Sequence, residues 1–288
     1  MYIYYYRFGV FSECEVKKEK YSRIVVKVGT STLSHESGKL NLRRIESLAR
    51  VLSDLKNSGI EIVLVSSGAV GAGIATLGLD RRPKDTAEKQ ALAAVGQSEL
   101  MKIYERFFSI YGQTVAQLLL TKDVVDNPER RESAANTFRI LFGFSCLPIV
   151  NENDPVSSAQ LETKSGDKIS FGDNDTLSAY VAELCDADLL INLSDSEGFF
   201  TADPRTDPNA KLIEKVERIT PELLACAGGA GTAGGTGGMR SKLEAAQIAG
   251  SAGIPMFLAH GAEPEVLYSI LEGKARGTYF AATKQERI

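Results

Sequence analysis

Three polar clusters in the sequence have the residue types of a binding site. An apolar run at residues 147–150 ends at Asn-Glu-Asn-Asp-Pro (151–155), and a second at 189–193 ends at Ser-Asp-Ser-Glu-Gly (194–198). The third cluster, Gly-Asp-Asn-Asp (172–175), precedes apolar residues at helical spacing. Carboxylates gathered in one place repel one another unless a cation, an ammonium group or lysines lie among them. The clusters therefore predict a site for such a group.

Each cluster alone also has the composition of an ordinary turn or helix N-cap. Two of them, however, follow strand-like runs, and the third starts a helix-like one. In α/β sheets, ligands bind beyond the carboxyl ends of the strands, which is where these side chains are expected. The combination favours a functional site over three unrelated turns.

Lys27 interrupts an apolar run, residues 24–28, just before Gly-Thr-Ser. A lysine in a buried strand is costly unless its ammonium group reaches an anion at the strand end. The alternative is a lysine that merely extends to solvent from the strand terminus. Lys242 follows a second unusual segment, the glycine run 228–238, and falls in the first turn of an expected helix. A basic residue there opposes the helix dipole, which is explained if a phosphate binds at the same place.

The glycine-rich segments do not match two common nucleotide-binding patterns. Residues 66–73, Ser-Ser-Gly-Ala-Val-Gly-Ala-Gly, form an expected strand-to-helix turn whose backbone amides could hold an anion, but they lack the G-x-G-x-x-G spacing. The run 228–238 is not followed by Gly-Lys-Ser/Thr, so it is no Walker A loop, and taken alone it also suits a linker.

Composition limits the classes of partner. The chain has 288 residues, a net charge of −4 and a pI near 5.5, and its longest basic run is 17–20, so we expect no nucleic-acid partner. Its start lacks the features of a signal peptide or membrane span, so we expect no membrane partner. Four widely spaced cysteines favour reduced thiols and a cytoplasmic location. Two distant histidines predict neither histidine catalysis nor a resident metal site.

Strand and helix patterns alternate along the chain. Strands are predicted at 24–28, 60–65, 113–120, 147–150, 189–193, 254–259 and 278–281, and helices at 42–57, 87–111, 129–142, 177–185, 221–226, 242–249 and 264–272. This order predicts an α/β fold with a mainly parallel sheet. We assign residues 1–22 to an N-terminal extension, 23–281 to one domain and 282–288 to a tail.

Taken together, the motifs resemble the glutamate 5-kinases, a branch of the amino acid kinase family. The motifs are VVKVGTS (25–31), SSGAVGAG (66–73), AAVGQ (93–97), FSIYG (108–112), NENDPV (151–156), FGDNDTLSA (171–179), SDSEGFFTADPR (194–205) and GTGGMRSK (235–242). The resemblance implies a three-layer αβα sandwich around a mainly parallel sheet. It also implies transfer of the γ-phosphate of ATP, with Mg²⁺, to the side-chain carboxylate of L-glutamate, the first step of proline biosynthesis.

The resemblance assigns roles residue by residue. Three residues are expected to be catalytic, with the carboxylate holding both ammonium groups: Lys27, Asp175 and Lys242. The expected glutamate site consists of Ser67, Asp154, Asn174, Asn151 and Asp173. The expected ATP site consists of Lys27, Ser194, Asp195, Thr236, Gly237, Gly238, Met239, Arg240, Ser241 and Lys242. No general base is expected, because the attacking carboxylate is already ionised at neutral pH, with a pKa of about 4.3.

Several points stay open. Many relatives have a lysine where this chain has Ser170, and Ser194 replaces their usual threonine. Many also carry a C-terminal PUA domain, for which the sequence after residue 281 has no room, so functions of that domain are not transferred. The resemblance implies a homo-oligomer and feedback inhibition by proline, on which the residues themselves are silent. The alternatives are a kinase of aspartate, acetylglutamate, carbamate or a nucleoside monophosphate, or a nucleotide-binding module without catalysis.

Overall fold

A single mixed sheet forms the centre of the molecule. The computed structural model describes residues 21–35, 38–81, 83–157, 171–226 and 238–283. The strands within these ranges are β1 Arg23–Val28, β2 Glu61–Val65, β3 Val115–Leu120, β4 Leu147–Glu152, β5 Leu189–Ser194, β6 Lys215–Val216, β7 Met256–His260 and β8 Thr278–Phe280. They lie in the order β3-β4-β2-β1-β5-β7-β8-β6. Among the described strands β7 and β8 form the one antiparallel pair, and β6 runs parallel to β8.

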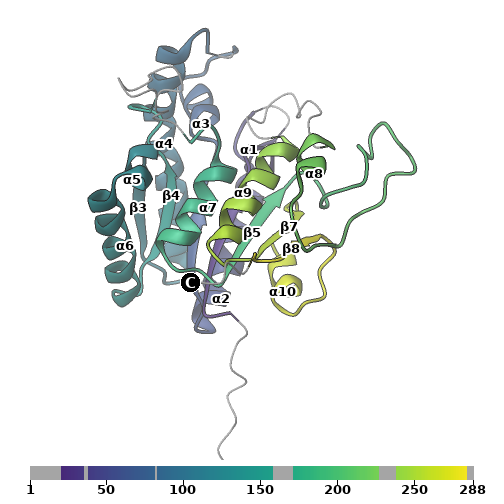
Figure 1. The fold of residues 1–288 in the computed structure, drawn as a ribbon. Coiled ribbons are helices and arrows are strands. Elements are labelled where there is room, and N and C mark those ends of the chain that lie inside the picture. The colour runs from purple at the N-terminus through teal and green to yellow at the C-terminus, as the bar shows by residue number, and fades with distance from the viewer. Residues whose placement is uncertain (1–20, 36–37, 82, 158–170, 227–237, 284–288) are drawn as a thin grey trace, which may run out of the picture.

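Helices connect the strands and cover the sheet (Figure 1). They are α1 Thr30–Leu33, α2 Leu42–Asn57, α3 Ala69–Thr76, α4 Thr86–Ile110, α5 Lys122–Asp126, α6 Pro128–Gly143, α7 Asn174–Leu184, α8 Pro221–Cys226, α9 Met239–Ser251 and α10 Val266–Leu271. Four begin at an Asn or Asp whose side chain accepts a hydrogen bond from a free backbone N–H of the first turn, which fixes where the helix starts. These N-caps are Asn41, Asp85, Asn127 and Asp173.

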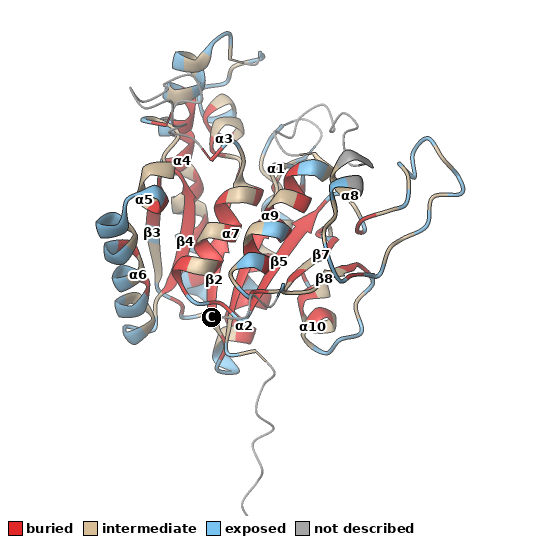
Figure 2. Cartoon of the chain, viewed as in Figure 1, coloured by how far each residue is buried: buried red, intermediate tan, exposed pale blue. Residues whose placement is uncertain are grey.

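Two hydrophobic cores lie on opposite faces of the sheet. One joins alternate strand residues such as Val25 and Leu190 to α6, α7 and α9, and the other joins Val26 and Ile191 to α2, α4 and α10. Because both faces are covered, the central strands are apolar almost throughout and buried, as Figure 2 shows. The predicted three-layer αβα sandwich around a mainly parallel sheet is confirmed.

The chain reverses its direction of sheet growth between β1 and β5. It passes from β1 to β2 on one side, adds β4 and β3 there, and then continues with β5 on the other side of β1. The register places Lys27 of β1 beside Val65 of β2 and beside Asn192 of β5. Ligands of open α/β sheets bind at such a switch point, beyond the carboxyl ends of the strands. Lys27 therefore lies where a ligand is expected.

Helices α3 and α4 pack with their backbones in contact. A Cβ added to Gly73 would lie 2.0 Å from the carbonyl oxygen of Leu92, and one added to Gly96 would lie 1.8 Å from that of Ala69. Only glycine permits this approach. The close packing brings Gln97 of α4 to the carboxyl end of the sheet.

The predicted elements differ from the structure mainly in short segments. The helices α1 and α5 and the two-residue strand β6 were not predicted, because elements of this length show no period. For α3 the sequence indicated only a strand-to-helix turn over residues 66–73, without the bounds of the helix. The strand predicted from Ile254 begins at Met256, since the N–H of Ile254 instead closes the end of α9 on Ala249. The domain bounds stay predictions, and residues 1–20 and 284–288 lie outside the described residues.

Candidate active site

A buried carboxylate with two lysines is the electrostatic centre of the site. The ammonium nitrogen of Lys27 lies 2.5 Å from Oδ1 of Asp175, and that of Lys242 lies 3.2 Å from Oδ2. Ser241 donates its hydroxyl to Oδ2 at 2.7 Å, and Asn192 donates its side-chain amide to Oδ1 at 2.9 Å. All three charged side chains are at most 7% exposed. The predicted pairing of Asp175 with both lysines is present.

The charges of this cluster do not cancel. Burial alone raises the pKa of Asp175, but the ammonium groups of Lys27 and Lys242 and the hydrogen bonds outweigh it and hold that pKa well below its usual range. Asp175 is therefore a carboxylate at neutral pH. Two ammonium groups and one carboxylate leave one net positive charge in a nearly water-free place, where it acts strongly on a bound anion.

Helix termini add to this positive potential. Asp175 lies in the first turn of α7, and Ser241 and Lys242 lie in the first turn of α9. Free backbone N–H groups make a helix N-terminus attractive to anions, which stabilises Asp175 but opposes Lys242. The N-cap Gly238 supplies no side-chain acceptor to α9, so no side chain of the cap satisfies these amides. The start of α9 thus presents N–H donors and a lysine together, a combination that suits an anion.

A network of neutral side chains lies at the ends of β2 and β4. Asn174 donates to Oγ of Ser67 and to Oδ1 of Asn151, both at 2.9 Å, and to the carbonyl oxygen of Ser66 at 2.5 Å. Asn151 in turn donates to Oε1 of Gln97 at 2.8 Å. The network joins α7, β2, β4 and α4. It presents amide and hydroxyl groups, which suit a zwitterionic or carboxylate ligand.

Asp173 and Asp154 contribute negative charge near this network. Asp173 caps α7 by accepting from the N–H of Thr176, and burial together with the nearby Asp175 raises its pKa. Burial likewise raises the pKa of Asp154, and the adjacent Glu152 carboxylate adds to the shift while Lys89 opposes it. A carboxylate that is destabilised in this way attracts an ammonium group strongly.

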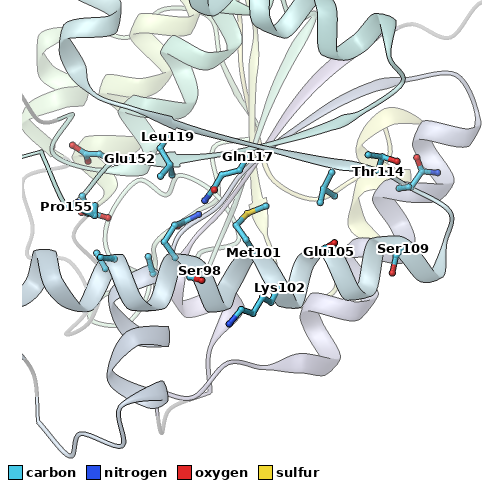
Figure 3. A pocket seen from close by; sticks show the side chains of 17 residues that line it. Ser98, Met101, Lys102, Glu105, Ser109, Thr114, Gln117, Leu119, Glu152 and Pro155 are labelled. Carbon is cyan, nitrogen blue, oxygen red and sulfur yellow. The ribbon is translucent and has the colours of Figure 1, made fainter.

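Asp154 lines one end of a groove of about 720 Å³ between α4 and β3. Figure 3 shows Glu152 and Pro155 at that end, Met101 and Gln117 in the middle, and Ser109 and Thr114 at the other end. Lys27, Asp175 and Lys242 do not line the groove. Gln97 does, so the groove meets the amide network rather than the charged cluster.

The remaining residues of the expected ATP site lie on two elements. Ser194 ends β5 and donates to Oδ1 of Asp195 at 3.1 Å. Met239 and Arg240 begin α9, where Arg240 forms an exposed ion pair with Glu244. The other expected ATP-site positions, Thr236 and Gly237, lie outside the described residues, as does Ser170, where many relatives have lysine.

Among the described residues, no group of three or more His, Cys, Asp or Glu side chains is placed to hold a metal ion. In the same ranges no helix is long and apolar enough to cross a membrane. Cys146 and Cys185 are free thiols, and burial raises the pKa of Cys185 to about 12.

Sequence reasoning missed two polar residues of the site. Asn192 lies in a run that predicts only a buried strand. Its place in the site becomes visible from the sheet register, which sets it beside Lys27 of β1, and from its hydrogen bond to Asp175. Gln97 was quoted within the motif AAVGQ but given no role, although it holds Asn151. Both contacts join residues more than fifteen positions apart, which a local pattern does not reveal.

The fold agrees with comparisons to known proteins. The chain belongs to the amino acid kinase family, whose model matches residues 22–260. It is 53% identical over 264 residues to the glutamate 5-kinase of Clostridium perfringens, covering 92% of this chain and 97% of that one. It is 51% identical over 264 residues to the glutamate 5-kinase of Listeria monocytogenes, covering 92% and 94% of the two chains.

Solved structures with the same fold are more distant in sequence. The isopentenyl phosphate kinase of T. acidophilum superposes with a TM-score of 0.60 at 16% identity, covering 90% of this chain and 99% of that one. A second isopentenyl phosphate kinase structure gives 0.62 at 15% identity, covering 90% and 100%. At this identity the likeness shows the shared fold alone.

Proposed function

We propose that this chain transfers the γ-phosphate of ATP to the side-chain carboxylate of L-glutamate, forming L-glutamyl 5-phosphate, the first step of proline biosynthesis. The observation that carries the proposal is the pair of buried ammonium groups on opposite oxygens of Asp175, beside a network of amides and hydroxyls. Relatives at 51–53% identity over about nine-tenths of the chain carry the name glutamate 5-kinase.

In the proposed reaction, an oxygen of the glutamate side-chain carboxylate forms a bond to the γ-phosphorus. The bond from that phosphorus to the β,γ-bridging oxygen breaks, and ADP leaves with the electron pair. No proton is transferred in this step, so no general base is required. Catalysis consists of positioning the two substrates and stabilising negative charge on the phosphoryl oxygens.

Lys27 and Lys242 are the residues that we assign to charge stabilisation. Their ammonium nitrogens lie 2.5 and 3.2 Å from the carboxylate oxygens of Asp175, and this carboxylate orients them. Each ammonium group has three N–H donors, so donors remain for the phosphate oxygens. The N-terminus of α9, with Gly238 to Lys242, would hold the nucleotide phosphates. Ser194 and Asp195 lie at the end of β5, next to β1, where they would contact the rest of the nucleotide.

We assign the glutamate to the amide network. The hydroxyl of Ser67, which accepts from Asn174, would donate to one substrate carboxylate, and Asn174 would exchange one of its present acceptors for a carboxylate oxygen, with Asn151 and Asp173 completing the site. The carboxylate of Asp154 suits the α-ammonium group. A nucleoside monophosphate acceptor would instead need arginines near Ser67, and the sequence around that residue supplies none.

Magnesium is assigned to the nucleotide rather than to the protein. The one deeply buried carboxylate of the cluster, Asp175, already has both oxygens engaged by lysines and hydrogen bonds. Mg²⁺ is commonly held by substrate phosphates with few protein ligands. We therefore derive no step from a protein-bound metal.

We also propose the setting of the reaction. Free Cys146 and Cys185 are consistent with the reducing cytoplasm, where we place the enzyme. A homo-oligomer and inhibition by proline rest on the family resemblance. Sedimentation of the purified protein and assays with added proline test these two properties.

A coupled assay of ADP release tests the proposed function. With Mg-ATP, L-glutamate should support rapid release, while aspartate, acetylglutamate and carbamate should support much less. Equal rates with all acids would overturn the choice of substrate, and no acid-dependent release would favour a nucleotide-binding module without catalysis.

A further inference from the structure

Asn192 is a polar residue inside an otherwise apolar stretch of β5. It is fully buried, and the register places it beside Lys27 of β1 and beside Leu258 of β7. Its side-chain amide donates to Oδ1 of Asp175 at 2.9 Å. Oδ1 of Asn192 itself accepts no hydrogen bond from the described residues. The reverse amide orientation would put this oxygen against the carboxylate, so the contacts fix the orientation.

We propose that Asn192 is a positioning residue that holds the Asp175 carboxylate in place while Lys27 and Lys242 act on the phosphoryl group. This inference rests on the proposed function. The ammonium groups of Lys27 and Lys242 each divide their N–H donors between Asp175 and the phosphate oxygens. As negative charge develops on the phosphate oxygens, the hydrogen bonds of these ammonium groups to Asp175 weaken. The amide of Asn192 has no such second partner, so its bond to Oδ1 persists through the reaction.

The lack of charge on the Asn192 side chain is as important as its geometry. A lysine at this position would add a third positive charge, and an aspartate would cancel the single net positive charge of the cluster. The neutral amide of Asn192 supplies a hydrogen-bond donor and leaves the net charge of the cluster unchanged. Among short side chains, asparagine thus combines a hydrogen-bond donor with no effect on the field at the phosphate.

The buried Oδ1 also indicates a role in function rather than in stability. A buried acceptor without a partner destabilises the folded state, and the neighbouring positions, Ile191 and Leu193 in β5 and Leu258 in β7, are aliphatic. Leucine has a similar size and would remove this unpaired oxygen. Proteins keep such locally unfavourable residues mainly at functional sites.

The first test replaces Asn192 by leucine and measures kinetics and thermal unfolding together. We expect kcat to fall about tenfold, the scale of one hydrogen bond to a charged group, with both KM values within about twofold of the wild type. The melting temperature should be unchanged or higher. Ser53→Ala, which removes a buried hydroxyl of α2 that donates to Ala49, serves as the control and should leave kcat unchanged.

The outcomes of this test are distinct. An active wild type with an unchanged kcat in Asn192→Leu overturns the inference. A fall in kcat together with a lower melting temperature also overturns it, because the residue is then structural. A wild type that releases no ADP with glutamate contradicts the proposed function instead.

The second test uses Asn192→Asp and the pH dependence of kcat. The charged groups facing the new carboxyl are Lys27 from β1, Asp175 from α7 and Lys242 from α9. When protonated, the new group donates an O–H to Asp175 as the amide does, but when ionised it repels Asp175 and cancels the net charge. The ratio of variant to wild-type kcat should therefore rise as the pH falls from about 8 to about 6. A ratio that does not change with pH contradicts the positioning role.

Discussion

Asn174 and Ser67, 107 residues apart in the chain, are joined by a hydrogen bond of 2.9 Å at the carboxyl edge of the sheet. Asn174 is the first residue of α7, and Ser67 follows β2. Asp175, the next residue of α7, binds both lysines of the charged cluster. The first turn of α7 therefore connects the expected glutamate site directly to the residues expected to act on the phosphoryl group.

Substitution of Ser67 or Asn174 by alanine should weaken glutamate binding selectively. Each variant removes a donor that we assign to a substrate carboxylate, and a lost hydrogen bond to a charged group corresponds to about 1.5–3 kcal/mol. We expect KM for glutamate to rise about tenfold or more and KM for ATP to change little. Steady-state kinetics with each substrate varied provides the measurement. Ser251→Ala, an exposed serine at the end of α9, is the matched control, and a larger effect on ATP would place these residues in the nucleotide site.

Replacing Lys27 or Lys242 by methionine should act mainly on kcat. Methionine retains much of the length and the apolar stem of lysine but removes the charge that we assign to transition-state stabilisation. The expected loss is about a hundredfold, on the scale of one preorganised group, with KM for glutamate nearly unchanged. Lys102→Met, at an exposed position of α4, is the control. Losses below about tenfold in both variants would show that other residues organise the chemistry.

Asp175 should make the protein sensitive to acid. Its pKa is lower in the folded than in the unfolded protein, so its charged form stabilises the fold above the unfolded pKa, and this stabilisation is lost as the pH falls through the folded pKa. Urea unfolding from about pH 6 down to about pH 3 should show falling stability, with a shallower decline in Asp175→Asn. At neutral pH that variant should be less stable by about 3–5 kcal/mol, because it leaves two buried ammonium groups without a carboxylate. Equal acid dependence in the two proteins would contradict the pairing.

The raised pKa of Asp154 leads to a prediction about glutamate affinity. Burial, followed by the charge of Glu152, favours the protonated form, whereas binding of the α-ammonium group requires the carboxylate. KM for glutamate should therefore rise as the pH falls, beginning above the usual titration range of aspartate. Asp154→Asn should have a high KM that no longer depends on pH in this range. A pH dependence that survives the substitution would assign the titration to another group.

The same variant should gain stability at neutral pH. A carboxyl group whose folded pKa is raised destabilises the fold once the pH exceeds its unfolded pKa, and asparagine removes that unfavourable charge. A variant that binds glutamate poorly and yet unfolds at higher urea concentration would identify Asp154 as a residue kept for binding.

The sequence predicted the parts of this molecule that local pattern and motif determine. The main strands and helices follow from the spacing of apolar residues along the chain. The pairing of Asp175 with Lys27 and Lys242 was expected from the family motifs. Asn192 and Gln97 received no role, because their contacts depend on sheet register and on the packing of α3 against α4 through Gly73 and Gly96. Short elements such as α1 and β6 carry too few residues to show a period.

The central claim is that a side-chain oxygen of glutamate attacks the γ-phosphorus of ATP, and oxygen labelling tests it most directly. Glutamate labelled with ¹⁸O in the side-chain carboxylate is incubated with the enzyme, Mg-ATP and hydroxylamine, which attacks the acyl carbon of the product and releases phosphate. The account predicts glutamyl hydroxamate together with phosphate that carries one ¹⁸O atom per molecule. Phosphate without ¹⁸O would mean that water attacks ATP and would contradict the account.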